Sequence, residues 1–270
     1  MFLGICGILG KMGSLVFECA KQSKDFTVNL GVDKRAEELV KGIFLTYKLK
    51  NINHKTNVLI DFSSREMTQE LLEYAVRTKT PLVIGTTGQT TEDLIAIHNA
   101  AKEIPIMLCP NTSLGAAYLI NSAKEGAQYF LDYNYEIDIS ETHHSQKKDS
   151  PSGTALAIAN AILSVAPSLK QVTSFENGRQ NGDLSISSRR LGGVVGEHEV
   201  SFASQGEIIS IKHRVLDKKV FALGSLECAR FIAFKSPGLY TISDMFDFKK
   251  AQPNAEHLNA EQNNSADFSK

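Results

Sequence analysis

Short apolar runs alternate with amphipathic stretches along the first part of the chain, up to about residue 110. The apolar runs predict strands at 2–6, 27–32, 58–62, 81–84 and 104–108. Stretches between them, such as 67–77, place their apolar residues on one face of a helix. Strands that are apolar throughout and that alternate with helices are typical of a parallel sheet covered on both faces. The pattern therefore predicts an α/β fold with a doubly wound, Rossmann-type parallel sheet.

The pattern changes after Pro110. A helix is expected at 114–130 and another, rich in alanine, at 152–165, with an alternating strand between them at 135–141. Further strands then follow one another without helices, at 184–190, 195–203 and 207–215. Consecutive strands favour a mainly antiparallel sheet, so this part is predicted to be α+β. A helical period returns at 220–234, and we expect this helix to pack back onto the first part.

These two patterns predict two domains, which a chain of 270 residues can accommodate. Residues 1–112, completed by a C-terminal helical region at 219–250, are expected to form the first domain, and 113–218 the second. The end of the chain, 251–270, is polar and rich in Asn and Gln, which predicts a disordered tail.

Composition narrows the class of protein without identifying it. Apolar residues make up 42% of the chain, enough to bury a core, and no apolar stretch reaches the length of a membrane span. With 29 Lys and Arg against 30 Asp and Glu there is no basic excess, which favours a small-molecule partner over nucleic acid or a membrane. The four cysteines are scattered and form no CxxC pair, so we expect a soluble protein of the reducing cytoplasm.

The first chemical motif is the glycine-rich turn at 7–13, G-I-L-G-K-M-G, between the first strand and the following helix. Glycines at this junction permit a tight turn and let backbone N–H groups approach a pyrophosphate. The spacing is G-x-x-G-x-x-G and not the usual G-x-G-x-x-G, so a purely structural turn is the alternative.

Charged residues follow the second strand, where a dinucleotide site has its ribose contact. Asp33 can accept hydrogen bonds from ribose hydroxyls, whereas Lys34 and Arg35 suit a 2′-phosphate. A solvated charged turn is the alternative. Together with the glycine-rich turn, these residues predict NADH or NADPH as the cofactor and do not choose between them.

Two later loops, 85–88 and 109–113, follow strands at the edge where ligands bind to open parallel sheets. Their small hydroxyl residues suit the nicotinamide ribose or carboxamide of a cofactor. Ordinary turn and helix-cap chemistry explains either loop equally well when it is taken singly.

The densest chemistry lies at 141–154, E-T-H-H-S-Q-K-K-D-S-P-S-G-T. Ser152 is a good N-cap, and Pro151 is tolerated beside it, so a helix is expected to begin with the N–H groups of Gly153 and Thr154 free. A helix end of this kind attracts an anion, and a carboxylate is the natural candidate. Lysine or histidine from the preceding loop can supply the proton that accompanies hydride transfer.

Two alternatives apply to the histidine pair, His143 and His144. A histidine is often a satisfied structural side chain, although two in tandem before a lysine and a helix cap make that less favourable. Glu141, His143, His144 and Asp149 are also all metal-ligand types. Their spacing matches no zinc motif, so no metal is predicted.

The pattern E-T-H-H-x-x-K-x-D-x-P-S-G-T-A resembles the signature of the 4-hydroxy-tetrahydrodipicolinate reductases, or dihydrodipicolinate reductases, of bacterial lysine and diaminopimelate biosynthesis. The resemblance extends over roughly residues 1–250. Its other motifs are G-x-x-G-K-M-G near the start, V-L-I-D-F-S at 58–63, V-I-G-T-T-G at 83–88, P-N-x-S at 110–113, R-x-G-x-x-V-G-E-H at 190–198 and F-A-x-G from Phe221.

This resemblance implies an NADH- or NADPH-dependent oxidoreductase that reduces a cyclic dicarboxylate to tetrahydrodipicolinate. His143 would be the catalytic proton donor or acceptor and Lys147 the proton donor. The substrate carboxylates would be held by His144, Lys147, Gly153 and Thr154. The cofactor-binding site would be lined by Gly7, Ile8, Leu9, Gly10, Lys11, Met12, Asp33, Lys34, Gly85, Thr86, Thr87, Cys109, Pro110, Asn111 and Thr112. Domain 1–112 would bind the dinucleotide, and 113–218 would bind substrate and form a homotetramer through its sheet.

The chain departs from the family pattern at two cofactor positions. Leu9 replaces a small residue, which leaves less room for a pyrophosphate, and Thr112 stands where an aromatic residue is frequent. The alternative enzyme is a related dehydrogenase of another anionic substrate, such as aspartate dehydrogenase. A nucleotide-sensing regulatory module would need no proton donor, so His143 and Lys147 count against it.

Overall fold

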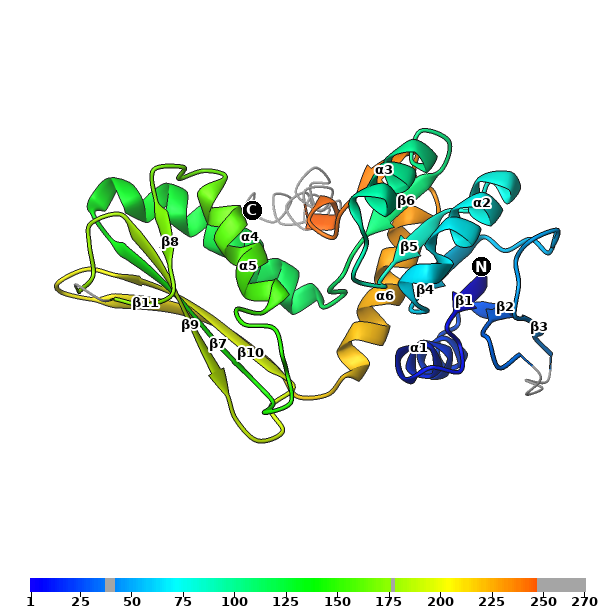
Figure 1. Cartoon of the computed structure of the whole chain (residues 1–270), viewed down its shortest axis with the longest axis horizontal. Coiled ribbons are helices and arrows are strands. Elements are labelled where there is room, and N and C mark those ends of the chain that lie inside the picture. Colours follow the sequence, from blue (N-terminus) through cyan, green and yellow to red (C-terminus); the bar gives the residue numbers. More distant parts are fainter. Residues whose placement is uncertain (37–41, 176–177, 247–270) are drawn as a thin grey trace, which may run out of the picture.

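The computed structural model describes residues 1–36, 42–175 and 178–246, which form two sheets lying side by side (Figure 1). The predicted tail at 251–270 and the end of the predicted region 219–250 lie outside the described residues. Among those described, no helix is long and apolar enough to cross a membrane. The domain boundaries predicted near 112 and 218 stay predictions.

The first sheet is parallel throughout, in the order β12-β6-β5-β4-β1-β2-β3. Its strands are β1 (Phe2–Cys6), β2 (Thr27–Val32), β3 (Phe44–Thr46), β4 (Val58–Asp61), β5 (Leu82–Ile84), β6 (Pro105–Leu108) and β12 (Gly238–Tyr240). Helices α1 (Lys11–Gln22) and α6 (Lys219–Ile232) pack in the apolar cluster on one face, and α2 (Thr68–Thr78) and α3 (Thr91–Ala100) in the cluster on the other. This confirms the doubly wound, Rossmann-type sheet and the return of a C-terminal helix to it.

Strand β4 shows why these strands are continuous apolar runs. Val58 and Ile60 lie in the cluster with α1 and α6, whereas Leu59 lies in the cluster with α2 and α3. All three are fully buried, so both faces of the strand need apolar side chains. The strands β3, β12 and β8 (Lys170–Val172) are not predicted from the pattern. Each has only three residues, and unlike those of the equally short β5 they are not all buried, so they form no continuous apolar run.

The second sheet has the order β11-β10-β7-β9-β8. Its longer strands are β7 (Glu136–His143), β9 (Asp183–Arg190), β10 (Gly196–Ala203) and β11 (Ile208–Val215). β10 pairs antiparallel with β11 and β7, while β9 pairs parallel with β7 and β8. Helices α4 (Leu114–Phe130) and α5 (Gly153–Leu163) both cover one face of this sheet (Figure 1). Short 3-10 turns occupy Arg65–Met67 and Leu131–Tyr133.

The mainly antiparallel α+β part is therefore confirmed, with one difference from expectation. The consecutive strands β9 and β10 are not neighbours, because β7 lies between them. β9 is reached from β7 through α5 and β8, and a crossover of this kind leaves the two strands parallel. This insertion of β7 matters for the site, since side chains from both neighbours reach it.

The loop after β6 ties the two sheets together. The Thr112 hydroxyl donates to the carbonyl of Phe221 at 2.7 Å, just inside α6. Gly224 packs so closely there that a Cβ would stand 1.8 Å from the carbonyl oxygen of Thr112. On the other side, the Asn111 amide donates to the Thr154 hydroxyl of α5 at 3.0 Å. The end of β6 is thus joined to a helix of each part.

Candidate active site

The glycine-rich turn between β1 and α1 has a backbone that only glycine adopts without strain. Gly7 has a φ of +76°, and a Cβ there would stand 2.4 Å from the carbonyl oxygen of Phe62. A Cβ at Gly13 would stand 2.0 Å from the carbonyl oxygen of Gly7. Helix α1 begins at Lys11 after Gly10, without a side-chain cap or an acidic residue in its first turn. Its free N–H groups suit a phosphate, which fits a dinucleotide.

Asp33 braces this turn from the end of β2. One of its carboxylate oxygens accepts from the Leu9 N–H at 3.0 Å, and the other accepts from the Arg35 N–H at 3.0 Å. The Arg35 guanidinium donates to the carbonyl of Leu9. The Leu9 side chain packs against the apolar cluster. The backbone of Leu9 is therefore held at both its N–H and its carbonyl.

A pocket of about 310 Å³ lies beside Asp33. Its lining includes Gly7, Gly10, Asp33, Lys34, Arg35 and Tyr47. The structure thus brings Gly7 and Gly10 of the predicted pyrophosphate turn to the same cavity as Asp33 and Lys34, which were predicted for the ribose. The other residues predicted from this turn, Ile8, Leu9, Lys11 and Met12, are not among the lining residues. One acid and two bases at the same pocket leave both NADH and NADPH open.

Asp61, at the end of β4, lies next to the loop that lines this pocket and was not assigned from the sequence. Its buried carboxylate accepts hydrogen bonds from the N–H of Ser63 at 2.9 Å and from the Ser63 hydroxyl at 2.5 Å. Burial raises the pKa of the Asp61 carboxyl, although these hydrogen bonds oppose the shift. The carboxyl thereby shapes the loop at 62–64, which lines the pocket. The available signal was an acid at the end of an otherwise apolar strand.

The two later loops lie after β5 and β6, at the same edge of the first sheet. A Cβ at Gly85 would stand 2.4 Å from the ring of Phe62, so this loop packs tightly against the pocket wall. Thr86 is buried and Thr87 exposed. Cys109 is buried and Pro110 is exposed, while the Thr112 hydroxyl donates a hydrogen bond to a carbonyl of α6. The predicted cofactor contacts of these residues stay predictions.

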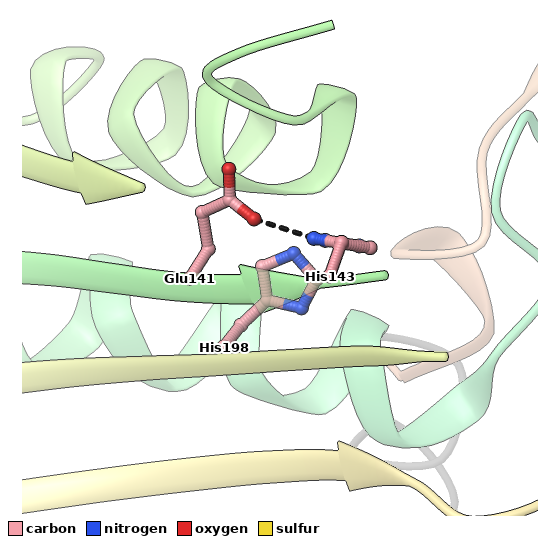
Figure 2. A group of neighbouring side chains, drawn as sticks. All are labelled: Glu141, His143 and His198. Carbon is pink, nitrogen blue, oxygen red and sulfur yellow. Dashed lines mark hydrogen bonds and ion pairs between the residues drawn. The ribbon is translucent and has the colours of Figure 1, made fainter. Parts of the chain in front are cut away.

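Side chains along β7 alternate between the two faces of the second sheet, and those of Glu141 and His143 lie on the face that the helices cover. Both side chains are buried, and His143 Nδ1 is hydrogen bonded to a Glu141 carboxylate oxygen (Figure 2). Gly196 on β10 leaves room for the imidazole, since a Cβ there would stand 3.1 Å from His143 Nε2. The first histidine of the pair is therefore fixed at one ring nitrogen.

The second oxygen of Glu141 accepts from Arg190 Nη1 at 2.9 Å and from the Ser152 N–H at 3.3 Å. Burial by itself raises the pKa of the Glu141 carboxyl, but hydrogen bonds from Ser188, His143 and Arg190 outweigh it and leave the pKa below its usual value. Burial lowers the pKa of His143, and Glu141 opposes that shift. Glu141 is therefore a carboxylate at neutral pH.

His198 stands beside His143, with ring centroids 5.1 Å apart (Figure 2). Its Nε2 lies 3.0 Å from the hydroxyl of Ser152, which also caps α5 by accepting from the Ala155 N–H at 3.2 Å. Its Nδ1 is buried and finds no hydrogen-bond partner among the described residues. Burial lowers the pKa of His198 to about 4, so the ring is neutral at pH 7.

The loop before α5 carries Lys147, whose ammonium pairs with Asp149 at 2.8 Å. Arg190 donates to the carbonyl of Lys147 at 3.3 Å and also to the carbonyl of Asp149. His144 is half-buried beside this loop. At the first position of α5, no atom of the described residues lies within 4 Å of where a Cβ of Gly153 would stand. His144 and Lys147 therefore lie on the segment that leads into the start of α5, and their contacts with a substrate stay predictions.

Ligand-type atoms of Glu141, His143 and His198 lie within 4.8 Å of one another. This set differs from the one considered from the sequence, because His198 takes the place of His144 and Asp149. Glu141 is already bonded to His143 and paired with the guanidinium of Arg190, whose charge would repel a metal ion. The cluster therefore fits a hydrogen-bonded network better than a metal centre.

Arg190 and His198 are the residues of this half that sequence reasoning left without a role. Both lie in the motif at 190–198, which was noted only as part of a resemblance. Neither is near Glu141 in the sequence, so only the sheet brings them to it.

Family models match nearly the whole chain: “Dihydrodipicolinate reductase, N-terminus” over residues 1–112 and “Dihydrodipicolinate reductase, C-terminus” over 115–246. The 4-hydroxy-tetrahydrodipicolinate reductase of Caldanaerobacter subterraneus subsp. tengcongensis is 40% identical over 246 residues, which cover 89% of this chain and 96% of that protein. The protein of the same name from Aquifex aeolicus is 36% identical, with 89% and 97% covered. The chain belongs to the dihydrodipicolinate reductase family. The resemblance noted in the sequence is confirmed.

Solved structures agree on the fold. A dipicolinate-bound dihydrodipicolinate reductase from Paenisporosarcina sp. TG-14 superposes with a TM-score of 0.76 at 24% identity, covering 89% of this chain and 97% of that one. A probable dehydrogenase from Thermotoga maritima gives a TM-score of 0.58 at 12% identity, covering 90% and 92%. As a member of the dihydrodipicolinate reductase family, the chain is an NAD(P)H-dependent oxidoreductase with an N-terminal nucleotide-binding part. Family membership disfavours the alternative of a dehydrogenase acting on another substrate.

Proposed function

We propose that this protein converts 4-hydroxy-tetrahydrodipicolinate to tetrahydrodipicolinate with NADH or NADPH, a step of lysine and diaminopimelate biosynthesis in which the hydroxyl group leaves as water and the unsaturated ring takes up hydride and a proton. The observation that carries the proposal is the gathering of His143, Lys147 and the open start of α5 at one place. Asn111, at the cofactor edge of the first sheet, is hydrogen bonded to Thr154 on that same helix. The site for an anionic ring therefore adjoins the site for the cofactor.

On the cofactor side, N–H groups at the start of α1 would hold the pyrophosphate, and Asp33 with Lys34 would meet the ribose. The loops at 85–87 and 109–112 would line the nicotinamide end. When bound, the cofactor supplies the hydride that the ring of the substrate receives. The conformation of the glycine-rich turn is held by hydrogen bonds of Leu9 with Asp33 and Arg35, which supports this contact.

On the substrate side, the N–H groups of Gly153 and Thr154 would bind carboxylate oxygens at the positive end of a helix. Lys147 and His144 would complete the carboxylate contacts. Lys147 and His143 would transfer a proton to the ring atom next to the one that receives the hydride. A dicarboxylate suits this set of donors, because each carboxylate gains charge-assisted hydrogen bonds.

The test is turnover of freshly generated substrate with each cofactor in turn, followed by the loss of reduced-nicotinamide absorbance. We expect oxidation of at least one cofactor and competitive inhibition by pyridine-2,6-dicarboxylate, a planar mimic with both carboxylates. Oxidation of neither cofactor would refute the proposed reaction. Turnover without competition by the dicarboxylate would favour a different anionic substrate.

We further propose that the chain forms a homotetramer in the cytoplasm. Since α4 and α5 cover one face of the second sheet, the other face is available for contact (Figure 1). It carries polar pairs such as Lys212 with Glu197 at 2.6 Å and with Glu199 at 3.3 Å. The free, buried cysteines suit a reducing compartment. Sedimentation velocity would give the mass in solution, and a monomer would contradict the assembly without affecting the proposed reaction.

A further inference from the structure

The carboxylate of Glu141 lies at the centre of the substrate half, yet its side chain has 0% exposed surface and so cannot touch a substrate. His143, Arg190 and the Ser152 N–H all converge on it. We infer that Glu141 is a positioning residue, which holds the His143 ring with Nδ1 protonated and leaves Nε2 to carry the proton of the reaction. This inference rests on the proposed function of His143.

The direction of the hydrogen bond follows from the charge of Glu141. An ionised carboxylate can only accept, so His143 Nδ1 must carry the hydrogen. Neutral His143 then has its lone pair on Nε2, and protonated His143 has its second N–H there. Nε2 points away from Glu141, toward Gly196, whose missing side chain gives the ring its space. Without Glu141, either nitrogen could hold the hydrogen, and the reactive one would be uncertain.

Glu141 also sets the charge that His143 can carry. The groups facing His143 are Glu141 on its own strand, Arg190 on β9, His198 on β10 and Lys147 on the loop, while Asp149 pairs with Lys147 and His213 on β11 faces His198. Burial and the cations Lys147 and Arg190 lower the pKa of His143, and Glu141 raises it. Removing the negative charge would therefore make His143 lose its proton at lower pH.

The same carboxylate connects the proton site to the carboxylate site. Its second oxygen accepts from the N–H of Ser152, which caps α5 just before Gly153. That oxygen also accepts from Arg190, whose guanidinium holds the carbonyl of Lys147. A single buried group thus sets the relative positions of His143, the Lys147 loop and the start of α5.

The test is Glu141→Gln, which keeps the shape of the side chain and removes its charge. We expect kcat to fall by roughly 100-fold, as for loss of a correctly placed general acid, while KM for the cofactor stays unchanged. We also expect the fall of kcat on the alkaline side to move to lower pH, because the proton on His143 is less stabilised. Glu141→Asp keeps the charge, so in this variant kcat should fall at an alkaline pH close to that of the wild type.

Glu103→Gln is the matched control, since Glu103 is exposed and pairs with Lys79 at 2.8 Å, away from both halves of the site. Its kcat and pH profile should equal those of the wild type. If Glu141→Gln lowers kcat equally at every pH, Glu141 merely supports the fold and the inference is overturned. Loss of wild-type turnover on chelation would also overturn it, because Glu141, His143 and His198 would then hold a metal.

The tautomer of His143 can be measured without any variant and without turnover. Nitrogen-15 NMR of histidine-labelled wild-type protein, assigned with His143→Gln, should show Nδ1 protonated in the neutral ring. A ring protonated at Nε2 instead would overturn the inference, even if Glu141→Gln does not fold. An inactive wild type that still shows the Nδ1–H tautomer would separate the failure of the proposed reaction from the role of Glu141.

Discussion

The two halves of the site present helix N-termini that are built by different means. At α1 the binding surface is backbone, shaped by Gly7 at a φ of +76° and left without a side-chain cap. At α5 the helix is capped by Ser152, and the buried Glu141 accepts from the N–H of that cap. The first arrangement is specified by a few consecutive residues, whereas the second depends on partners from distant strands. The cofactor half is therefore local in sequence and the substrate half is a product of the sheet.

The register of the second sheet makes this dependence concrete. Glu141 lies opposite Ser188 of β9 and His198 of β10, and His143 lies opposite Arg190. Because side chains alternate between faces along a strand, a slip by one residue would turn these side chains to the opposite face. Insertion of β7 between β9 and β10 thus assembles the acid, the two histidines and the arginine.

Lys147→Ala should impair the substrate half of the site and leave the cofactor half unchanged. Of the proposed variants it has the largest expected effect. Loss of the proposed proton donor should lower turnover by on the order of 10²–10⁴-fold. The affinity for NADH or NADPH, measured by calorimetry, should stay nearly unchanged, since Lys147 lies on the loop before α5. Lys148→Ala is the control, because Lys148 is exposed beside it and has no assigned role. Unaltered turnover in Lys147→Ala would refute the role of this lysine.

His198 should make the substrate half sensitive to acid. Its folded pKa, about 4, lies below the usual 6.5, so its contribution to stability is present above pH 6.5 and lost as the pH falls toward 4. The full loss is about 3 kcal/mol in the free energy of unfolding. Urea unfolding of His198→Gln at about pH 7 and about pH 4.5 should show a smaller decrease than the wild type. His98→Gln, at an exposed position of α3, should behave like the wild type, and equal decreases in all three proteins would contradict the prediction.

The same contrast explains how much could be predicted from the sequence. The glycine-rich turn, Asp33 and the start of α5 were all found, because each depends on residues close together in the chain. Arg190 and His198 received no role, since their contact with Glu141 depends on strand order, and β9 was expected beside β10. Asp61 was missed because an acid after an apolar strand looks like an ordinary strand end. The family resemblance supplied the reaction, which neither periodicity nor spacing could provide.

Asp33→Asn should affect the cofactor half alone. Asparagine can still accept from the Leu9 N–H, but it no longer repels a 2′-phosphate. We expect kcat/KM for NADPH relative to NADH to rise about tenfold, equivalent to about 1.4 kcal/mol. Inhibition by pyridine-2,6-dicarboxylate against the substrate should not change, because the proposed site for that ligand is the other half. An unchanged cofactor ratio would show that Lys34 and Arg35 determine the preference instead.

Thr112→Val examines the connection between the halves and has the smallest expected effect. Valine keeps the shape of the buried side chain but loses the hydrogen bond to the carbonyl of Phe221, at 2.7 Å. The free energy of unfolding in urea should fall by about 1 kcal/mol, because a buried side-chain hydrogen bond is lost. Thr91→Val, at an exposed position of α3, should change it by less than about 0.5 kcal/mol. If Thr112→Val is as stable as the wild type, the close packing of Gly224 against the Thr112 carbonyl is sufficient to hold the loop, and the hydroxyl contributes nothing to holding the loop against α6.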